Sequence, residues 1–392
     1  MILPLRIRIL MASTTARVQP EATALALVLW AASAGRTEIA APLIAASTLP
    51  QLFTGPVLGS ALDRARNPER WVAGCATLAT AGCVVLAVSD LQLAPALLAA
   101  VIFSVCTPVL TGGLSSVIMG WSDDHSMLAA WDGTGYNIAG LLAPAVVTAV
   151  AAWRPPAAFM LLAVFTFLAA AQLATTRTAR RTNQTPDTAA RPGILDAARS
   201  IGRSRALLAV TVSTTMFSLG LGGLELALVA AVDAYQLPPE RAGVAATSIA
   251  IGALAGSLAL TRTRRRPEPV SMTLAAIMAS GALLMLLSGV GWPIMIPVAV
   301  AIGMADGPLL VATYRARSDY APAHLRSGVF TLGASAKLGA SSIGALLLGA
   351  IVADRPTMLG LLAIGGVGIL AACTGMLINH SPSSRSLPTD HT

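Results

Sequence analysis

Twelve stretches of Ala, Leu, Val, Ile and Gly, each about twenty residues long, fill nearly the whole chain of 392 residues. Hydrophobic residues make up 55% of the sequence and charged residues only 11%, which leaves little to build the polar face that a helix of a soluble protein needs. In a bilayer, a helix of about 20 residues satisfies its own backbone hydrogen bonds across the hydrocarbon. The sequence therefore predicts an all-α fold, a polytopic membrane protein with twelve transmembrane helices.

The predicted spans are separated by short loops and by one long polar connection. Their bounds are about 14–34, 38–62, 71–89, 95–118, 127–152, 157–175, 206–232, 242–261, 270–290, 294–314, 327–350 and 357–378. The first span imitates a signal peptide, because it follows several arginines and ends in small residues, but we expect an uncleaved helix. Glu21, near the start of this span, and Glu38, after its end, are expected at the membrane interface.

Arginine placement predicts the topology. With the N-terminus in the cytoplasm, 21 arginines, Arg17 and Arg317 among them, fall in segments on the cytoplasmic side. The other side holds four, which are Arg36, Arg154, Arg241 and Arg355. Because basic residues are retained in cytoplasmic loops, we expect a multi-pass protein of the cell membrane with both termini in the cytoplasm. The net charge of +8 is then explained by contact with membrane lipids, and no nucleic-acid partner is expected.

The chain divides into two similar halves. We predict an N-terminal six-helix bundle over 1–175, a cytoplasmic arginine-rich linker over 176–205, a C-terminal six-helix bundle over 206–378 and a cytoplasmic tail over 379–392. A shift of 200 residues places Pro108 on Pro308 and Asn137 on Lys337. These matches indicate an internal duplication and hence two pseudo-symmetric bundles, the usual construction of a secondary transporter.

The segment from Gly59 to Arg70 lies between the second and third spans. It resembles the G-x-x-x-D-R-x-G-R-R loop signature of the major facilitator superfamily, with Gly59, Asp63 and Arg64 in place and Arg70 standing in for a lost basic residue. Together with the two sets of six spans, the resemblance covers the whole chain. It implies a drug-exporter-like transporter in which Asp63 helps to close a cytoplasmic gate; the alternative is a solvated loop pair of Asp63 and Arg64.

One signature of exporters is poorly kept. The fifth span of proton-coupled exporters carries G-x-x-x-G-P, and here Ala139 and Ala143 occupy the glycine positions before Pro144. The resemblance is therefore carried by the loop and the helix count, and not by this motif.

Two ionisable residues of opposite charge fall inside neighbouring spans. Asp306 lies in the tenth span, and Lys337, the only lysine, lies in the middle of the eleventh. A charge near the bilayer centre costs about 2.5–3.5 kcal/mol on insertion scales, so each needs a partner or a function. We predict an ion pair that opens when a proton or an anionic substrate competes for it. The alternative is a permanent bridge that only fixes packing.

Two further candidates lie in the fifth and seventh spans. Asp132, Tyr136 and Asn137 fall on one helix face and form a candidate substrate-contacting surface, although Asp132 would also fit a shallow, solvated position. Glu225 follows Gly222-Gly223 and is a candidate for carrying a proton, or alternatively for an interfacial capping role.

Other chemistries lack the residues they need. The four cysteines lie in apolar spans and the four histidines in loops or the tail, so no metal site or cofactor is expected. The predicted function is secondary active transport of a small organic solute by alternating access, as a monomer, with protons as the coupling ion and export as the direction. Solute uptake by a proton symporter is the alternative. From other classes, a membrane enzyme using Asp123, Asp124 and His125, or a non-transporting scaffold, would also fit.

Overall fold

The protein is described here by a computed structural model, which covers residues 4–89, 92–122, 125–176, 194–262, 267–322, 325–354 and 359–380. Within these residues the chain is helical and contains no strand, so the all-α prediction is confirmed. The first half contains α1 (Leu5–Ser33), η1 (Thr37–Ile39), α2 (Ala40–Thr48), α3 (Gln51–Arg64), α4 (Pro68–Val88), α5 (Leu93–Pro108), η2 (Val109–Gly113), α6 (Leu114–Ile118), α7 (His125–Trp153) and α8 (Pro155–Thr175).

The second half repeats this pattern after an additional short helix. Its elements are α9 (Ile194–Arg203), α10 (Arg205–Leu221), α11 (Leu224–Asp233), α12 (Glu240–Arg262), α13 (Pro269–Leu287), α14 (Trp292–Tyr320), α15 (Arg326–Asp354) and α16 (Leu359–His380). The bounds of the last six predicted spans agree with α10–α16 to within a few residues, except that α14 extends to Tyr320, six residues past the predicted end.

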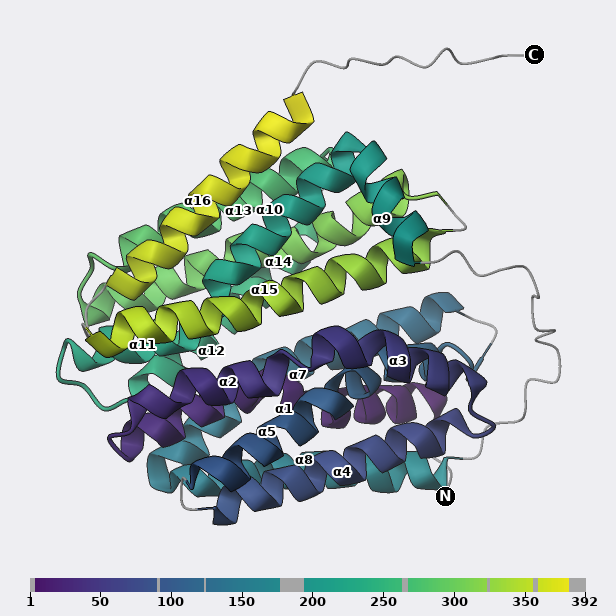
Figure 1. Ribbon diagram of the computed structural model, residues 1–392, viewed down its shortest axis with the longest axis horizontal. Coiled ribbons are helices and arrows are strands. Elements are labelled where there is room, and N and C mark those ends of the chain that lie inside the picture. The colour runs from purple at the N-terminus through teal and green to yellow at the C-terminus, as the bar shows by residue number, and fades with distance from the viewer. Residues whose placement is uncertain are drawn as a thin grey trace.

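The two halves lie side by side. Helices α1–α8, purple through blue to teal in Figure 1, pack together in one part of the molecule, and α9–α16, teal through green to yellow, pack together in the other. The turn between α3 and α4, with Arg66 and Arg70, and helix α9, with Arg199 and Arg203, lie at one end, which we call the arginine-rich end (Figure 1). The turns after α7 and α11 lie at the opposite end.

In the described residues, ten helical segments are long and apolar enough to cross a membrane. The two predicted spans missing from this set correspond to α1 and to the pair α2–α3. Helix α1 contains four charged side chains (Arg6, Arg8, Arg17 and Glu21), and α2 and α3 are separated by a turn at Leu49 and Pro50. A protein with many membrane-spanning helices is supported, and the number twelve stays a prediction.

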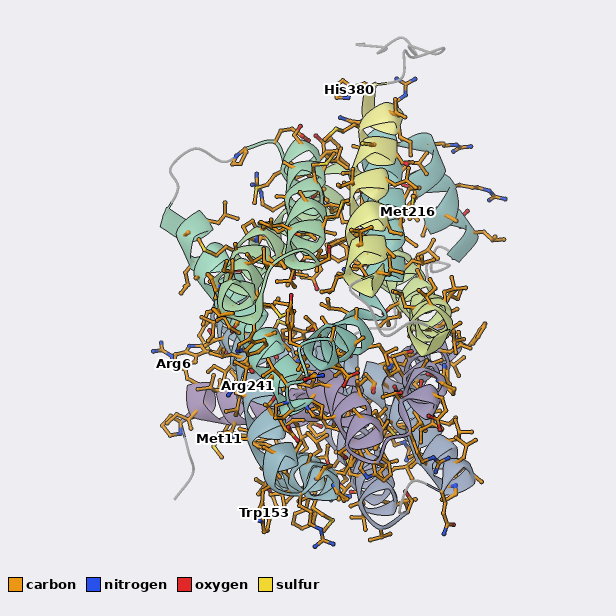
Figure 2. All side chains as sticks on the ribbon, turned by 90° about the vertical axis from the view of Figure 1, so that its left-hand side faces the viewer. Arg6, Met11, Trp153, Met216, Arg241 and His380 are labelled. Atoms are coloured by element: carbon orange, nitrogen blue, oxygen red, sulfur yellow. The ribbon has the colours of Figure 1, made fainter. Side chains whose placement is uncertain are left out.

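The outer surface of both halves is apolar. Phe167, Leu258 and Leu377 are all more than half exposed. Trp153, at the end of α7, is 82% exposed and stands at the outer edge of the N-terminal half in Figure 2. Large apolar side chains exposed over helices of this length are the surface that lipid tails cover in a membrane protein.

Helix α1 begins nine residues earlier than predicted, at Leu5 instead of residue 14. This corrects the position of Arg17, which was assigned to a cytoplasmic segment but lies in the interior of α1 with 1% of its surface exposed. The same correction applies to Arg317, which lies near the end of α14 with 2% exposed. Both arginines have a role inside the protein and do not report on the topology.

The linker predicted as a polar connection contains a helix, α9. Its Ala197 and Ile201 side chains are buried against Leu207 of α10 and Val329 of α15. The side chain of Ser204 accepts a hydrogen bond from the backbone N–H of Leu207 at 3.4 Å and so caps α10 directly after α9 ends. Residues 177–193 of the linker and 381–392 of the tail lie outside the described residues.

Glycines allow two helices of the C-terminal half to touch along their backbones. Gly252 and Gly256 of α12 lie against the carbonyls of Val300 and Met304, and Gly303 of α14 lies against the carbonyl of Ile249. A Cβ at any of these glycines would overlap with the facing backbone. Small residues spaced by four on both helices are a common way to bring membrane helices into close contact.

Contacts between the halves gather toward the end opposite the arginine-rich one. Gly243 at the start of α12 lies against Thr148 near the end of α7, and Gly349 near the end of α15 lies against Ala41 at the start of α2. Deeper in, the Ser342 hydroxyl donates a hydrogen bond to the Thr48 hydroxyl at 2.7 Å. The halves are therefore held together at this end by small side chains in close contact.

Candidate binding site between the two halves

The interior of the N-terminal half contains an ion pair between α1 and α7. The Nη1 of Arg17 lies 2.7 Å from the Oδ1 of Asp132, and the two side chains are 1% and 11% exposed. The Ser13 hydroxyl, one turn before Arg17, donates to the same Oδ1 at 2.7 Å and also accepts a contact from Arg17. The alternative of a shallow, solvated Asp132 is therefore wrong.

A third segment completes this cluster. Helix α5 continues into the single π-helical turn η2, whose Thr111 carbonyl accepts a hydrogen bond from the Nη2 of Arg17 at 3.2 Å. The Ser115 hydroxyl in α6 accepts from the same nitrogen and donates to the Oδ2 of Asp132, both at 2.6 Å. The ion pair and these hydrogen bonds together connect α1, α6 and α7. The π-helical turn η2 takes part in the cluster, and such turns often occur at functional sites.

Next to the Arg17–Asp132 pair lie three exposed residues, Glu21, Tyr136 and Asn137. The Arg17 guanidinium stands 5.1 Å from the ring centre of Tyr136, one turn after Asp132 on α7. Glu21, one turn after Arg17 on α1, interacts with the Tyr136 hydroxyl and with the charge of Arg17. Tyr136 is 37% exposed, and Glu21 and Asn137 are also exposed, so this part of the site is open to water or solute.

The C-terminal half also buries an arginine. The Arg317 guanidinium of α14 lies against Gly333 of α15, where a Cβ would overlap with it. Its Nε and Nη2 atoms are buried and have no hydrogen-bond partner in the described part of the chain. Lys337 follows Gly333 by one turn and has Arg317 and, more weakly, Asp306 as electrostatic neighbours. A second cation thus lies beside the first.

Asp306 lies eleven residues before Arg317 on α14, which is about 16 Å along the helix axis. Among the described residues no ion pair within 4 Å joins it to Lys337, although the two charges interact. The predicted Asp306–Lys337 pair is therefore present as two neighbouring charges and not as a closed bridge.

The two halves bring their tyrosines together. Tyr314, one turn before Arg317, is an electrostatic neighbour of Tyr136 in the other half. It is 50% exposed, and its ring centre lies 5.7 Å from that of Phe330 on α15. Tyr136 and Tyr314 are thus neighbours across the boundary between the halves, and Arg317 is in turn an electrostatic neighbour of Tyr314.

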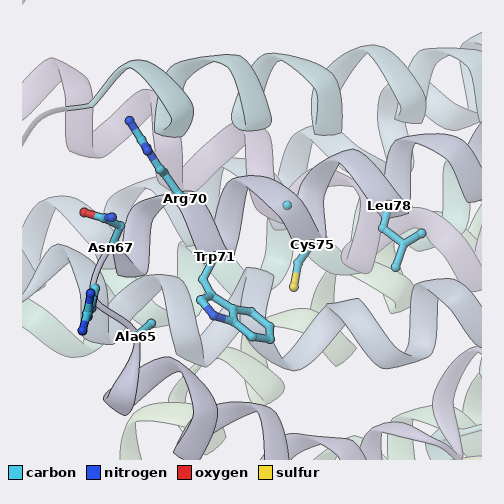
Figure 3. A pocket seen from close by; sticks show the side chains of 8 residues that line it. Ala65, Asn67, Arg70, Trp71, Cys75 and Leu78 are labelled. Atoms are coloured by element: carbon cyan, nitrogen blue, oxygen red, sulfur yellow. The ribbon is translucent and has the colours of Figure 1, made fainter.

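The remaining predicted site residues lie elsewhere. Glu225 is half-buried in the first turn of α11, directly after the break at Gly222 and Gly223, and no ion pair involves it in the described residues. Arg70 is exposed and lines an open pocket of about 580 Å³ with Arg66, Asn67, Trp71 and Leu78 (Figure 3). This pocket lies at the turn between α3 and α4, away from the residues described above.

Some predicted residues have no described side chain. Gly59, Asp63 and Arg64 belong to α3, but the surroundings of Gly59 and the side chains of Asp63 and Arg64 lie outside the described part of the structure, as do Asp123, Asp124 and the His125 side chain. The predicted gate role of Asp63 therefore stays a prediction.

Sequence reasoning missed three residues of the site. Glu21 was expected at the interface, and Arg17 and Arg317 were expected in cytoplasmic segments. The spacing of Arg17 and Glu21, four residues apart with Gln19 and Thr23 on either side of Glu21, is a signal that these groups share the interior of one helix. The sequence contains a weaker signal that Arg317 is buried. Its position three residues after Tyr314 is the feature that distinguishes it from the other arginines of that segment.

The sequence and the fold of this chain resemble those of known proteins. A sequence model of the Major Facilitator Superfamily matches residues 10–345. A search of curated protein sequences found no match. Among solved structures, a mutant of the nucleoside transporter NupG shares 14% identity with a TM-score of 0.77, covering 96% of this chain and 100% of that one.

Two further transporters have similar structures. A mutant of the peptide transporter POT has 17% identity and a TM-score of 0.69, covering 95% of this chain and 93% of its own. PepTSo, a transporter of the POT family, has 13% identity and a TM-score of 0.71, covering 96% and 98%. At these identities the likeness establishes the fold.

Proposed function

Because the chain belongs to the major facilitator superfamily, we propose that it is a secondary active transporter that exports a small organic solute in exchange for protons. It works by alternating access in the cell membrane, as a monomer with both termini in the cytoplasm. The bundles over 1–175 and 206–378 move against each other, and Asp63 helps to close the arginine-rich end. This assignment favours a transporter over a membrane enzyme.

One observation carries the proposal. Charged and polar side chains of α1, α7, α14 and α15 lie where the two halves face each other, and several of them, namely Glu21, Tyr136, Asn137 and Tyr314, are exposed. A charge inside a membrane-spanning helix, such as Asp306 or Lys337, costs about 2.5–3.5 kcal/mol unless it has a partner or a task. A solute that crosses between the halves has to pass these groups.

The residues divide between support and coupling. Asp132 has its charge satisfied by Arg17 and by the Ser13 and Ser115 hydroxyls, so we assign it to holding Arg17 beside Tyr136. Within the described residues, Glu21 has Tyr136 as a hydrogen-bond partner and Asp306 has Lys337 as an electrostatic neighbour, but neither has a comparable set of hydrogen bonds, so we propose them as the proton carriers. Tyr136 and Asn137 are proposed to contact the solute, and Glu225 is a further candidate carrier on α11.

Export is the proposed direction. The contacts between Thr148 and Gly243 and between Ala41 and Gly349 hold the halves together opposite the arginine-rich end. With that end in the cytoplasm, as its arginines predict, a solute would enter the site from the cytoplasm in this conformation. Uptake in symport with protons remains the alternative, because the same conformation also follows release into the cell.

The test is solute-dependent proton movement in proteoliposomes with a trapped pH indicator. Nucleosides and short peptides are the first solutes to try, since the similar structures are named as transporters of these classes. We expect flux that follows an imposed pH gradient in the wild type and is lost in Asp306→Asn and Lys337→Ala. Asp319→Asn, at an exposed position of the same helix α14, is the matched control and should keep the flux.

Direction is tested with membrane vesicles of both orientations. Accumulation in everted vesicles supports export, and accumulation only in right-side-out vesicles makes uptake the function. Flux that ignores the pH gradient, or that is unchanged in both the Asp306 and Lys337 variants while these remain monodisperse, would contradict proton coupling through this pair.

A further inference from the structure

The C-terminal half contains a buried positive charge for which the described residues supply no carboxylate within 4 Å. Arg317 is 2% exposed, and its Nε and Nη2 atoms have no hydrogen-bond partner in the described part of the chain. A guanidinium that has lost its water needs an anion or several acceptors to replace it. The site around Arg317 is therefore incomplete in the structure.

The neighbouring groups add to this excess of positive charge. Lys337 lies one turn beyond Gly333, against which the guanidinium packs, and its stronger electrostatic neighbour is the like-charged Arg317. The one carboxylate near them, Asp306, interacts with Lys337 but forms no ion pair with either cation within 4 Å among the described residues. Within the described residues, Lys337 therefore has Asp306 as an electrostatic neighbour, and neither cation has a carboxylate within 4 Å.

Tyr314 is an exposed residue and an electrostatic neighbour of Arg317. It precedes Arg317 by one turn of α14 and is 50% exposed. Its ring packs beside that of Phe330, so an aromatic pair lies close to the Arg317 guanidinium. Across the boundary, Arg17 is already neutralised by Asp132 at 2.7 Å, which leaves the charge of Arg317 available to a ligand. A guanidinium binds carboxylate and phosphate oxygens through paired N–H groups.

We propose that the transported solute carries an anionic group, a carboxylate, phosphate or sulfonate, that binds between Arg317 and Lys337 beside Tyr314. The inference rests on the proposed transport function, because it names the substrate class of that site. The anion supplies a counterion for Arg317, and the aromatic pair of Tyr314 and Phe330 contacts the rest of the solute.

Thermal unfolding of the full-length protein in detergent tests anion binding without any transport step. The probes are inorganic phosphate and acetate at millimolar concentration, with chloride keeping the ionic strength constant. We expect the melting midpoint of the wild type to rise and saturate with at least one probe, because a ligand that binds only the folded state stabilises it. In Arg317→Met the rise should disappear, and in Lys337→Gln the apparent dissociation constant should increase about tenfold.

The matched control is Arg315→Met. Arg315 lies on the same helix, but its guanidinium points to the carbonyl of Pro267, so this variant should respond like the wild type. Anions that stabilise proteins by exclusion from the surface act on all variants alike and do not saturate, which separates that effect from binding. If Arg317→Met does not fold, Lys337→Gln and Gly333→Ala, which displaces the guanidinium, provide the comparison.

Two results would overturn the inference. One is a wild type with no saturating response to either probe, and the other is an equal response in the wild type and in Arg317→Met. Proton-driven flux of a neutral solute combined with either result leaves the proposed transport function standing and removes only the anionic substrate class.

A lipid headgroup is the other source of such an anion. In nanodiscs of zwitterionic lipid the phosphate response should persist, and adding phosphatidylglycerol should not change it. Loss of the response in discs with phosphatidylglycerol would assign the site to a lipid and contradict a solute anion.

Discussion

Each half of the molecule buries one arginine beside a tyrosine, but the two arginines have different surroundings. Arg17 is held by Asp132, two hydroxyls and a backbone carbonyl, and Tyr136 stacks against it. Arg317 packs against Gly333, two of its nitrogens have no hydrogen-bond partner in the described part of the chain, and it acts on the like-charged Lys337. One half therefore contains an arginine whose charge is paired with a carboxylate, and the other contains an arginine for which the described residues supply no carboxylate within 4 Å.

The difference indicates which half has to change during transport. Breaking a buried ion pair leaves an uncompensated charge, so the Arg17 cluster resists rearrangement and fixes α1 against α7. A cation without a partner gains from any anion that reaches it, so the Arg317 region changes its energy when a ligand arrives. The N-terminal cluster is a support, and the C-terminal cations are the responsive part.

The largest effect is expected from breaking the Arg17–Asp132 ion pair. Arg17→Met leaves the Asp132 carboxylate buried without its cation, and we expect a loss of about 3–5 kcal/mol in the free energy of unfolding. Denaturant unfolding in detergent measures it. The double variant Arg17→Met/Asp132→Leu should recover most of the loss, because it removes both charges. A double variant as unstable as the single one would show that the pair is not the source of the stability.

A smaller effect on stability should distinguish the Arg17 site from the Arg317 site when the glycine packed in each, Gly135 or Gly333, is changed to alanine. At Gly135 of α7 a Cβ would meet the Ser13 side chain 2.5 Å away and the Leu10 carbonyl 3.2 Å away, so Gly135→Ala must push α1 from α7 at a cost of about 1–3 kcal/mol. At Gly333 a Cβ would meet the flexible end of Arg317. Gly333→Ala should therefore weaken phosphate binding and leave stability within about 0.5 kcal/mol of the wild type. Equal loss of stability in both variants would contradict the contrast.

The smallest expected effect on stability concerns Glu268, a carboxylate near the surface. Its partners are backbone N–H groups, whereas the partner of the buried Asp132 is an arginine. Burial alone would raise the pKa of Glu268, but the backbone N–H and side chain of Ser271, the backbone N–H of Val270 and the Tyr320 hydroxyl lower it below its ordinary value of 4.5. The two N–H groups donate at 2.6 and 3.0 Å at the start of α13.

The pH dependence of Glu268 follows from the sign of this shift. Because its pKa is lower in the folded protein, Glu268 contributes stability above pH 4.5, and this contribution is lost as the pH falls through the folded-state pKa. Glu268→Gln should make the protein slightly less stable at neutral pH and should flatten the acid limb of its stability curve. Thermal unfolding from pH 7 to pH 3 measures both. An unchanged acid limb would show that the hydrogen bonds of Glu268 contribute nothing to folding.

Most helix positions were predictable because the apolar stretches end where polar and turn-forming residues begin. Helix α8 runs over Pro155–Thr175, and residues 157–175 were predicted. The start of α1 was not predictable in this way, since Arg6, Arg8 and Arg17 were assigned to a loop on the basis of charge. The break of the seventh span at Gly222 and Gly223 and the π-helical turn η2 depend on packing against neighbouring helices, which the order of residues does not reveal.

The candidate site was only partly predictable, for a physical reason. Asp132, Tyr136, Asp306 and Lys337 stand out because they interrupt apolar sequence. Which cation lies next to which carboxylate depends on how distant helices pack, and Arg17 and Asp132 are 115 residues apart in the chain. The gate role of Asp63 and the bounds of the two bundles stay predictions.

The small residues that join the halves opposite the arginine-rich end carry a consequence for the speed of switching. Thr148 on Gly243, Ala41 on Gly349 and the Ser342–Thr48 hydroxyl pair involve no ionised group. Separating these contacts breaks no buried ion pair. The free-energy barrier to opening the protein at this end should therefore be low and independent of ionic strength. A bulky side chain in place of Gly349 would collide with Ala41 and separate the two halves at this end. The resting population of the transporter should then shift toward the conformation that is open at this end.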